Sequence, residues 1–236
     1  MGRGPSIEGR KNAEDAKRAR IFTKLIRDIT IAARAGADPA GNAKLRGAVD
    51  KALAANMPKD KIEKAIRRGS GADGGADLQE VRYEGYGPGG VALIIETLTD
   101  NPVRTVADVR HALSKNGGNL GTSGSVAFQF NRTGEILLSA EGITEEQVLE
   151  AALDAGAEDV FSDEGNIVVL CPTDGVDAVE QALRDAGLSV EQAGVAMRPA
   201  NRSSVSGDTA EQMRDLIEWL EELDDVNEVF HNAVFD

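Results

Sequence analysis

A glycine-rich segment at residues 69–77 divides this sequence into two parts and constrains its fold more than any other feature. The segment contains four glycines in nine residues and no apolar side chain larger than alanine. Such a composition is typical of a flexible linker or an exposed loop. The chain has 236 residues, which exceeds the usual size of one domain, so two or three domains are expected.

The two parts carry charges of opposite sign. Residues 1–70 contain 17 Lys and Arg against 8 Asp and Glu, a net charge of +9. Residues 71–236 contain 9 against 32, a net charge of −23, so the total of −14 hides a sharp division. Because a charge asymmetry of this kind reports on binding partners, the N-terminal part is expected to bind an anion.

The basic part shows helical periodicity over about residues 12–35, 42–55 and 58–68, which predicts a small three-helix bundle. The first helix carries five cations opposite its apolar face: Lys17, Arg20, Lys24, Arg27 and Arg34. The third helix carries five more around its apolar anchors: Lys59, Lys61, Lys64, Arg67 and Arg68. We predict that the basic surface contacts phosphates. The alternative is that these cations form an ordinary solvated helix face.

The acidic part begins with elements of a first α/β unit. The predicted elements are a hairpin of strands 79–86 and 91–98, a helix over 102–116 and a strand over 125–131. Glycine and proline at residues 87–90 supply the hairpin turn. Alternation in the last strand would place Val126, Phe128 and Phe130 on one side.

Residues 134–198 contain an internal repeat of strand, helix and strand. Its two predicted helices end in similar sequences, Ala-Ala-Leu-Asp-Ala-Gly at 151–156 and Ala-Leu-Arg-Asp-Ala-Gly at 182–187. The order βαββαβ is that of a ferredoxin-like module. A helix over about 209–223 and a strand over 226–234 follow, and they are expected to complete the sheet begun by residues 79–131.

These patterns predict an α+β protein. A three-helix N-terminal domain is followed by two α/β sandwich domains. One of these two domains, a ferredoxin-like βαββαβ module, is inserted in the other. The expected boundaries are a basic helical domain at 1–70, a linker at 71–78, a middle domain at 79–131 plus 201–236, and the inserted domain at 132–200.

The sequence offers no catalytic constellation. Asp108, His111 and Ser114 lie at i, i+3 and i+6 on one predicted helix without an adjoining oxyanion site. One cysteine, Cys171, and two histidines exclude a disulfide framework and a structural zinc site, and no cofactor is expected. The longest apolar run, Val91 to Ile95, is too short for a membrane span. A non-enzymatic cytoplasmic protein fits best.

A second cationic patch is expected on the predicted 102–116 helix, within the acidic part. Arg104, His111 and Lys115 lie on one face of this helix, with Arg110 to one side. They are candidates for a second contact surface. Ion pairing with neighbouring carboxylates is the alternative.

Several motifs, in order along nearly the whole chain, resemble those of the YebC/PmpR family. They are residues 10–18, 21–27, 55–60, 83–90, 107–111, 117–121 and 124–128. The resemblance implies a cytoplasmic, non-enzymatic protein with one helical and two α/β domains. Bacterial members are described as probable DNA-binding transcriptional regulators, mitochondrial relatives as translational activators, and the family is also linked to ribosomes.

The expected partner is therefore DNA or ribosomal RNA, because phosphate contacts look alike on both. An interaction protein that uses its acidic domains and ignores nucleic acid is a further alternative. The candidate nucleic-acid-binding residues are Arg10, Lys11, Lys17, Arg18, Arg20, Lys24, Arg27, Lys59, Arg104, Arg110, His111 and Lys115.

Overall fold

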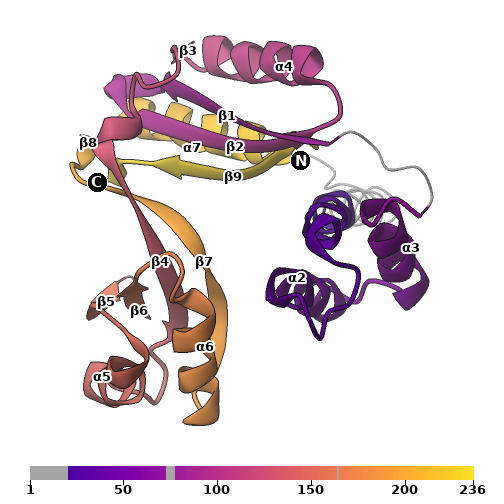
Figure 1. Ribbon diagram of the computed structural model, residues 1–236. Coiled ribbons are helices and arrows are strands. Elements are labelled where there is room, and N and C mark those ends of the chain that lie inside the picture. The colour runs from indigo at the N-terminus through magenta and orange to yellow at the C-terminus, as the bar shows by residue number, and fades with distance from the viewer. Residues whose placement is uncertain (1–20, 73–77, 164) are drawn as a thin grey trace, which may run out of the picture.

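The structure, a computed structural model, describes residues 21–72, 78–163 and 165–236. It has the predicted α+β class, with a helical N-terminal unit followed by two units that are each built on a four-stranded antiparallel sheet (Figure 1). No helix in these ranges is both long enough and apolar enough to cross a membrane. That the units fold separately, with boundaries at residues 70, 78, 131 and 200, stays a prediction.

The described N-terminal residues form the predicted helices. Residues 21–32 are helical and run into a 3-10 turn at Ala33–Ala35, α2 spans Ala43–Ala54 and α3 spans Lys59–Gly69. The Asn42 side chain begins α2 by accepting a hydrogen bond from the Leu45 amide, at 3.0 Å. The three helices bury a small aliphatic core that includes Ile29, Leu45 and Ile62. The predicted residues 12–20 of the first helix lie outside the described ranges.

The end of α3 packs closely on the first helix, and only glycine fits there. A Cβ atom on Gly69 would lie 2.1 Å from the Thr30 carbonyl oxygen and 2.8 Å from the Ala33 Cβ. These distances are well below van der Waals contact, and the oxygen belongs to the backbone of another helix. Gly69 is therefore a packing residue at the end of a helix, although the sequence places it at the start of the linker.

We expect Gly69→Ala to lower the free energy of unfolding of the N-terminal unit by about 1–3 kcal/mol, because the added methyl group must push two helices apart. Gly47→Ala in α2 is the matched control, since its Cβ would meet nothing within 4 Å. Alanine favours a helix over glycine by up to about 1 kcal/mol, so the control should be more stable than the wild type. Thermal unfolding of both variants measures the difference, and a stabilised Gly69→Ala protein would contradict this packing.

The middle unit is built on a sheet with strand order β3-β1-β2-β9. Its elements are β1 (Gln79–Tyr86), β2 (Ala92–Thr99), α4 (Pro102–Lys115), β3 (Asn119–Leu120), α7 (Gly207–Glu222) and β9 (Val226–His231). The predicted hairpin is confirmed, with Tyr86 paired to Ala92 beside the turn. The expected return of the C-terminal helix and strand is also confirmed, because β9 pairs antiparallel with β2.

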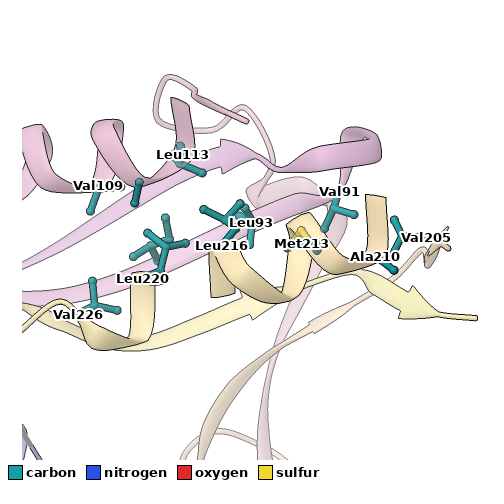
Figure 2. Close-up of a cluster of buried hydrophobic side chains, with 12 residues drawn as sticks. Val91, Leu93, Val109, Leu113, Val205, Ala210, Met213, Leu216, Leu220 and Val226 are labelled. Carbon is teal, nitrogen blue, oxygen red and sulfur yellow. The ribbon is translucent and has the colours of Figure 1, made fainter. Parts of the chain in front are cut away.

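The two faces of β2 contribute to two different cores. Val91, Leu93 and Ile95 point toward α4 and α7, where Figure 2 shows Leu93 among side chains from both helices. Ala92 and Ile94 point the other way and pack with Val126, Phe130 and Met197. All five residues of the apolar run 91–95 are fully buried. This run is the central element of the middle unit.

The predicted strand over 125–131 is wrong. Residues Ala127–Gln129 form a 3-10 turn, and the strand β4 begins only at Phe130. The cause is the buried Glu84 carboxylate, which accepts hydrogen bonds from the amides of Gly124, Val126 and Ala127 at 2.7, 2.8 and 2.9 Å. Amides held in this way cannot pair with a neighbouring strand. As a result Val126 and Phe130 are buried, whereas Phe128 is 76% exposed.

The inserted module has the predicted ferredoxin-like topology. Its strands follow the order β5-β6-β4-β7, with every pairing antiparallel. Its elements are β4 (Phe130–Ser139), α5 (Glu145–Ala152), β5 (Asp159–Asp163), β6 (Asn166–Cys171), α6 (Val176–Asp185) and β7 (Val190–Pro199). Its core joins aliphatic side chains of this sheet to those of α5 and α6.

Strands β4 and β7 form a ribbon that links the inserted module to the middle unit (Figure 1). They pair from Phe130 opposite Pro199 to Leu138 opposite Val190. At one end Phe130 and Met197 belong to the core beneath the middle sheet, and at the other Ile136 and Leu138 belong to the core of the module. The module is therefore attached by paired strands that both cores share.

The predicted strand 226–234 is divided in two. After β9 the side chain of the buried Asn232 accepts a hydrogen bond from the Ala92 amide at 2.8 Å. The chain then forms β10 (Ala233–Phe235), which pairs in parallel with β8 (Ser203–Val205). This short pair had no signal in the sequence pattern.

Candidate nucleic-acid interface

The structure describes seven of the twelve predicted nucleic-acid-binding residues. Arg10, Lys11, Lys17, Arg18 and Arg20 lie outside the described ranges. The other seven fall on three surfaces: the first helix, the start of α3, and the outer side of α4. The three surfaces differ in how far their cations contact groups of the acidic part of the chain.

Lys24 and Arg27 lie against the acidic end of α7 and not on a free solvated face. The Lys24 Nζ atom donates a hydrogen bond to the Glu221 carbonyl oxygen at 2.6 Å, and its burial lowers the pKa of its amine. Arg27 Nη2 lies 2.8 Å from Asp225 Oδ1, and its side chain is only 15% exposed. The helical wheel places both residues opposite the apolar face, but the alternative of an ordinary solvated face does not hold for these two residues, because both are engaged at the end of α7.

Asp225 is the centre of a buried polar cluster that joins three elements. Its Oδ2 atom accepts hydrogen bonds from Arg104 Nη2 at 2.8 Å and from Thr105 Oγ1 at 2.7 Å. Arg104 also pairs with Asp100 at 2.9 Å. Burial alone would raise the pKa of Asp225, but the bonds from Arg104 and Thr105, with the charge of Arg27, outweigh it and lower that pKa. Both carboxylates raise the pKa of the Arg104 guanidinium.

The predicted cationic patch on α4 is divided by these contacts. Arg104 is engaged with Asp100 and Asp225, as the ion-pairing alternative expects. Arg110, His111 and Lys115 are exposed further along the helix. The His111 ring meets the Trp219 ring of α7 edge to face, with centroids 5.6 Å apart. That contact gives His111 a packing role on the surface.

The exposed cations of α3 form a third basic surface. Lys59 lies at the first residue of the helix, and Lys61, Lys64, Arg67 and Arg68 are exposed along it, whereas Ile62 and Ala65 are buried. The Lys61 ammonium lies 5.4 Å from the centre of the Phe22 ring. Among the described residues, no carboxylate pairs with Lys59, Lys64 or Arg68. We call Lys61, Lys64, Arg67 and Arg68 the α3 basic face. The helical pattern in the sequence predicts this face. Of the twelve candidate residues, however, only Lys59 lies on α3, and Lys59 is not part of the face.

The Cys171 thiol and the His231 imidazole are both held in packed surroundings. Cys171 is fully buried in the core of the inserted module, and burial raises the pKa of its thiol. Burial lowers the pKa of His231, which packs edge to face against Phe235. Within residues 21–72, 78–163 and 165–236, no group of three or more His, Cys, Asp or Glu is placed to hold a metal ion.

Comparisons with known proteins match both parts of the chain. Residues 4–72 match a family described as the N-terminal domain of the TACO1/YebC protein, and residues 78–233 match its second and third domains. A "probable transcriptional regulatory protein" of Xanthomonas oryzae is 57% identical over 99% of this chain and 97% of its own. One of Stenotrophomonas maltophilia is 55% identical over the same shares.

A solved structure supports the same relationship at the level of the fold. The crystal structure of a conserved hypothetical protein from Aquifex aeolicus has a TM-score of 0.85 and 41% sequence identity, covering 94% of this chain and 92% of its own. The resemblance drawn from the motifs is thus confirmed by matches over nearly the whole length. This chain belongs to the TACO1/YebC family.

Proposed function

We propose that this protein is a cytoplasmic, non-enzymatic regulator of gene expression that binds DNA through its basic N-terminal helices. The observation that carries the proposal is the α3 basic face, with exposed cations in a protein whose residues 71–236 carry a net charge of −23. Lys and Arg on one helix face supply the phosphate contacts that dominate affinity for nucleic acid. The relatives of this chain are named probable transcriptional regulatory proteins.

The connection between α2 and α3 favours duplex DNA as the target. Only four residues, 55–58, separate the two helices, and Asn56 adopts a positive φ of 59° in that turn. A short turn between two helices is the arrangement of helix-turn-helix proteins, in which the second helix enters the major groove. In this arrangement α3 would be the helix that meets DNA, with Lys59 at its leading end. Any contact by Lys24 or Arg27 would first require their release from Glu221 and Asp225.

Charge reversal on α3 tests the proposal. In the full chain, Arg68→Glu should weaken binding to duplex DNA and reduce the slope of log K against log salt by about one, because one phosphate contact is lost. Adding Lys64→Glu should reduce the slope by about one more. The loss should be similar for different DNA sequences, since phosphate contacts position the protein and do not read bases. Binding titrations at several salt concentrations measure the slope.

The matched control is Arg184→Glu, an equal charge reversal on the exposed surface of α6 that should leave the slope unchanged. If the α3 variants also leave the slope unchanged, the α3 basic face does not bind DNA. A parallel experiment measures binding of the wild-type protein to ribosomes. It is done at about 0.15 M salt, where screening removes most non-specific attraction. Retention on ribosomes but not on DNA would replace transcription by translation as the process that this protein regulates.

A further inference from the structure

Phe128 is an exposed aromatic side chain in a segment that is otherwise anchored. Its side chain is 76% exposed, whereas Val126 and Phe130 on either side are 0% and 6% exposed and share one core. The chain thus buries both neighbours and turns the aromatic ring outward. An exposed phenylalanine gains nothing from burial in the folded chain, so its position requires a different account.

The loop that presents Phe128, residues 121–129, is held by hydrogen bonds along its length. Glu84 accepts three amide bonds within it, and the Glu84 carbonyl oxygen accepts one more from the Gly121 amide at 2.8 Å. The Tyr86 hydroxyl donates to the Ser125 carbonyl oxygen at 3.1 Å. At the far end the Ala200 amide donates to the Gln129 carbonyl oxygen at 2.8 Å. The ring is therefore presented by a fixed loop, which lowers the entropy that a ligand must remove on binding.

The surroundings of Phe128 differ in charge from the rest of the acidic part. Segments 121–134 and 196–207, which lie side by side through the β4–β7 pairing, contain three arginines and no Asp or Glu. Arg198 is engaged with Glu135 and lies over the Phe161 ring. Arg132 and Arg202 are exposed and have no ion-pair partner among the described residues. This region has a local net charge of +3 within residues 71–236, whose net charge is −23.

The carboxylates bonded to these two segments are already occupied. Glu84 is saturated by loop amides, Glu135 holds Arg198, and Asp236 accepts a hydrogen bond from the Ser204 hydroxyl at 2.5 Å. The positive charge of Arg132 and Arg202 is therefore available to an anion from outside. An exposed aromatic ring and unpaired arginines on neighbouring segments suit a ligand that combines a flat base with phosphates.

We propose that Phe128, Arg132 and Arg202 form a binding site for single-stranded nucleic acid, separate from the α3 basic face. An unpaired base stacks on the Phe128 ring, and the two arginines contact the phosphates that flank it. Arg132 lies four residues beyond Phe128, mostly along strand β4, which corresponds to at most about 14 Å at 3.4 Å per residue. A duplex hides its base faces in the stack, so this site selects unpaired strands.

The test uses the full chain carrying Lys64→Glu and Arg68→Glu, so that the α3 basic face contributes little to binding. The probes are oligouridylate and oligothymidylate of about 12 nucleotides, which distinguish RNA from DNA as the source of the strand. Phe128→Ala should weaken binding about tenfold, since stacking on an aromatic side chain contributes on the order of 1–3 kcal/mol per base. Phe128→Trp should retain binding. Arg132→Gln and Arg202→Gln should each reduce the salt slope by about 0.7.

Two further variants separate stacking from other roles of Phe128. Phe128→Leu keeps an exposed apolar side chain but removes the ring, so it should bind as weakly as Phe128→Ala. Val103→Ala changes an equally exposed apolar residue, 78% exposed on α4, and should bind normally. In a Trp219→Phe background, Phe128→Trp provides the only tryptophan, and its fluorescence should be quenched by the oligonucleotide.

The proposal is overturned if Phe128→Ala binds as tightly as its parent, or if Phe128→Leu retains full affinity. The second result would mean that residue 128 contributes an apolar contact and that no base stacks on its ring. These outcomes are independent of the function proposed above, because they are measured on single strands and read at residue 128. If the α3 basic face does not bind DNA, that result would appear only in the titrations with duplex DNA.

Discussion

Asp225→Ala is expected to lower the free energy of unfolding by about 3 kcal/mol. The substitution leaves Arg27, Arg104 and Thr105 without their shared acceptor, and removing one partner of a buried ion pair costs on the order of 3–5 kcal/mol. The lower end of that range applies here because the Arg104 side chain is 47% exposed and Asp100 remains beside it. Water can therefore replace part of what Arg104 loses, whereas Arg27 stays in a site that excludes most solvent.

Urea unfolding measures the effect, and Asp224→Ala is the matched control. Asp224 is the neighbouring residue and carries the same charge, but it is exposed, so its substitution should change stability by less than about 0.5 kcal/mol. Amide hydrogen exchange over residues 21–32 should also accelerate in Asp225→Ala, because Arg27 ties that helix to the middle unit. Equal stabilities of the two variants would show that the cluster contributes nothing beyond a surface charge.

Glu84→Gln is expected to lower the free energy of unfolding by about 2–3 kcal/mol. The side chain of Glu84 is buried, and both of its oxygens accept backbone amides. A glutamine of the same shape has one acceptor oxygen and one NH₂ group, so the NH₂ group faces an amide donor that is left unsatisfied. Amide exchange at Gly124, Val126 and Ala127 should accelerate together in the variant. Protection unchanged at these three amides would contradict the role assigned to the carboxylate.

The effect of Glu84 should depend on pH with a definite sign. Burial alone would raise the pKa of Glu84, but the three amide bonds outweigh it and hold that pKa below its ordinary value of 4.5. A carboxyl group with a lowered pKa stabilises the fold fully above its unfolded value, and this stabilisation is lost as pH falls through the folded value. The stability difference between wild type and Glu84→Gln should therefore be constant above about pH 5.5 and shrink below pH 4.5.

The matched control for this pH dependence is Glu80→Gln. Glu80 lies on the same strand and, four residues away, on the same face, but it is exposed. Its substitution should leave stability and its dependence on pH close to those of the wild type. If the wild-type protein and Glu84→Gln lose stability in parallel as pH falls, another carboxyl group is responsible for the acid sensitivity.

Local patterns predicted much of this fold. The hairpin of β1 and β2 was predicted because segments 79–86 and 91–98 flank a Gly-Pro-Gly-Gly turn, and all of these signals lie within twenty residues. The ferredoxin-like module was predicted because its strand and helix periods repeat in order. The return of the last helix and strand to the sheet begun by residues 79–131 followed from elimination, since they had no partner within the repeat, and the structure adds that the strand pairs with β2.

The errors come from contacts between residues far apart in sequence. Alternation at Val126, Phe128 and Phe130 indicates a strand, and only Glu84, about 40 residues earlier, takes the amides that this strand would need. The helical wheel places Lys24 and Arg27 on the polar face, but it does not reveal that Glu221 and Asp225 lie opposite them, nearly 200 residues later. Among the described residues, no carboxylate pairs with Lys64 or Arg68 of the α3 basic face, and the same wheel places both of these exposed cations correctly.

The β4–β7 ribbon gives the attachment of the inserted module a mechanical character. Phe130 and Ile136 lie six residues apart along the extended strand β4, so the two cores to which they belong lie about 20 Å apart. The ribbon is only two strands wide from Phe130 to Thr133, because β6 joins β4 at Gly134. Two-stranded ribbons twist more strongly than wide sheets, so torsion over this short stretch is expected to be the softest motion of the module. The module is therefore expected to rotate about the long axis of the ribbon while its distance from the middle unit stays constant. Phe128 lies at the end of the ribbon that is attached to the middle unit, where this rotation is smallest.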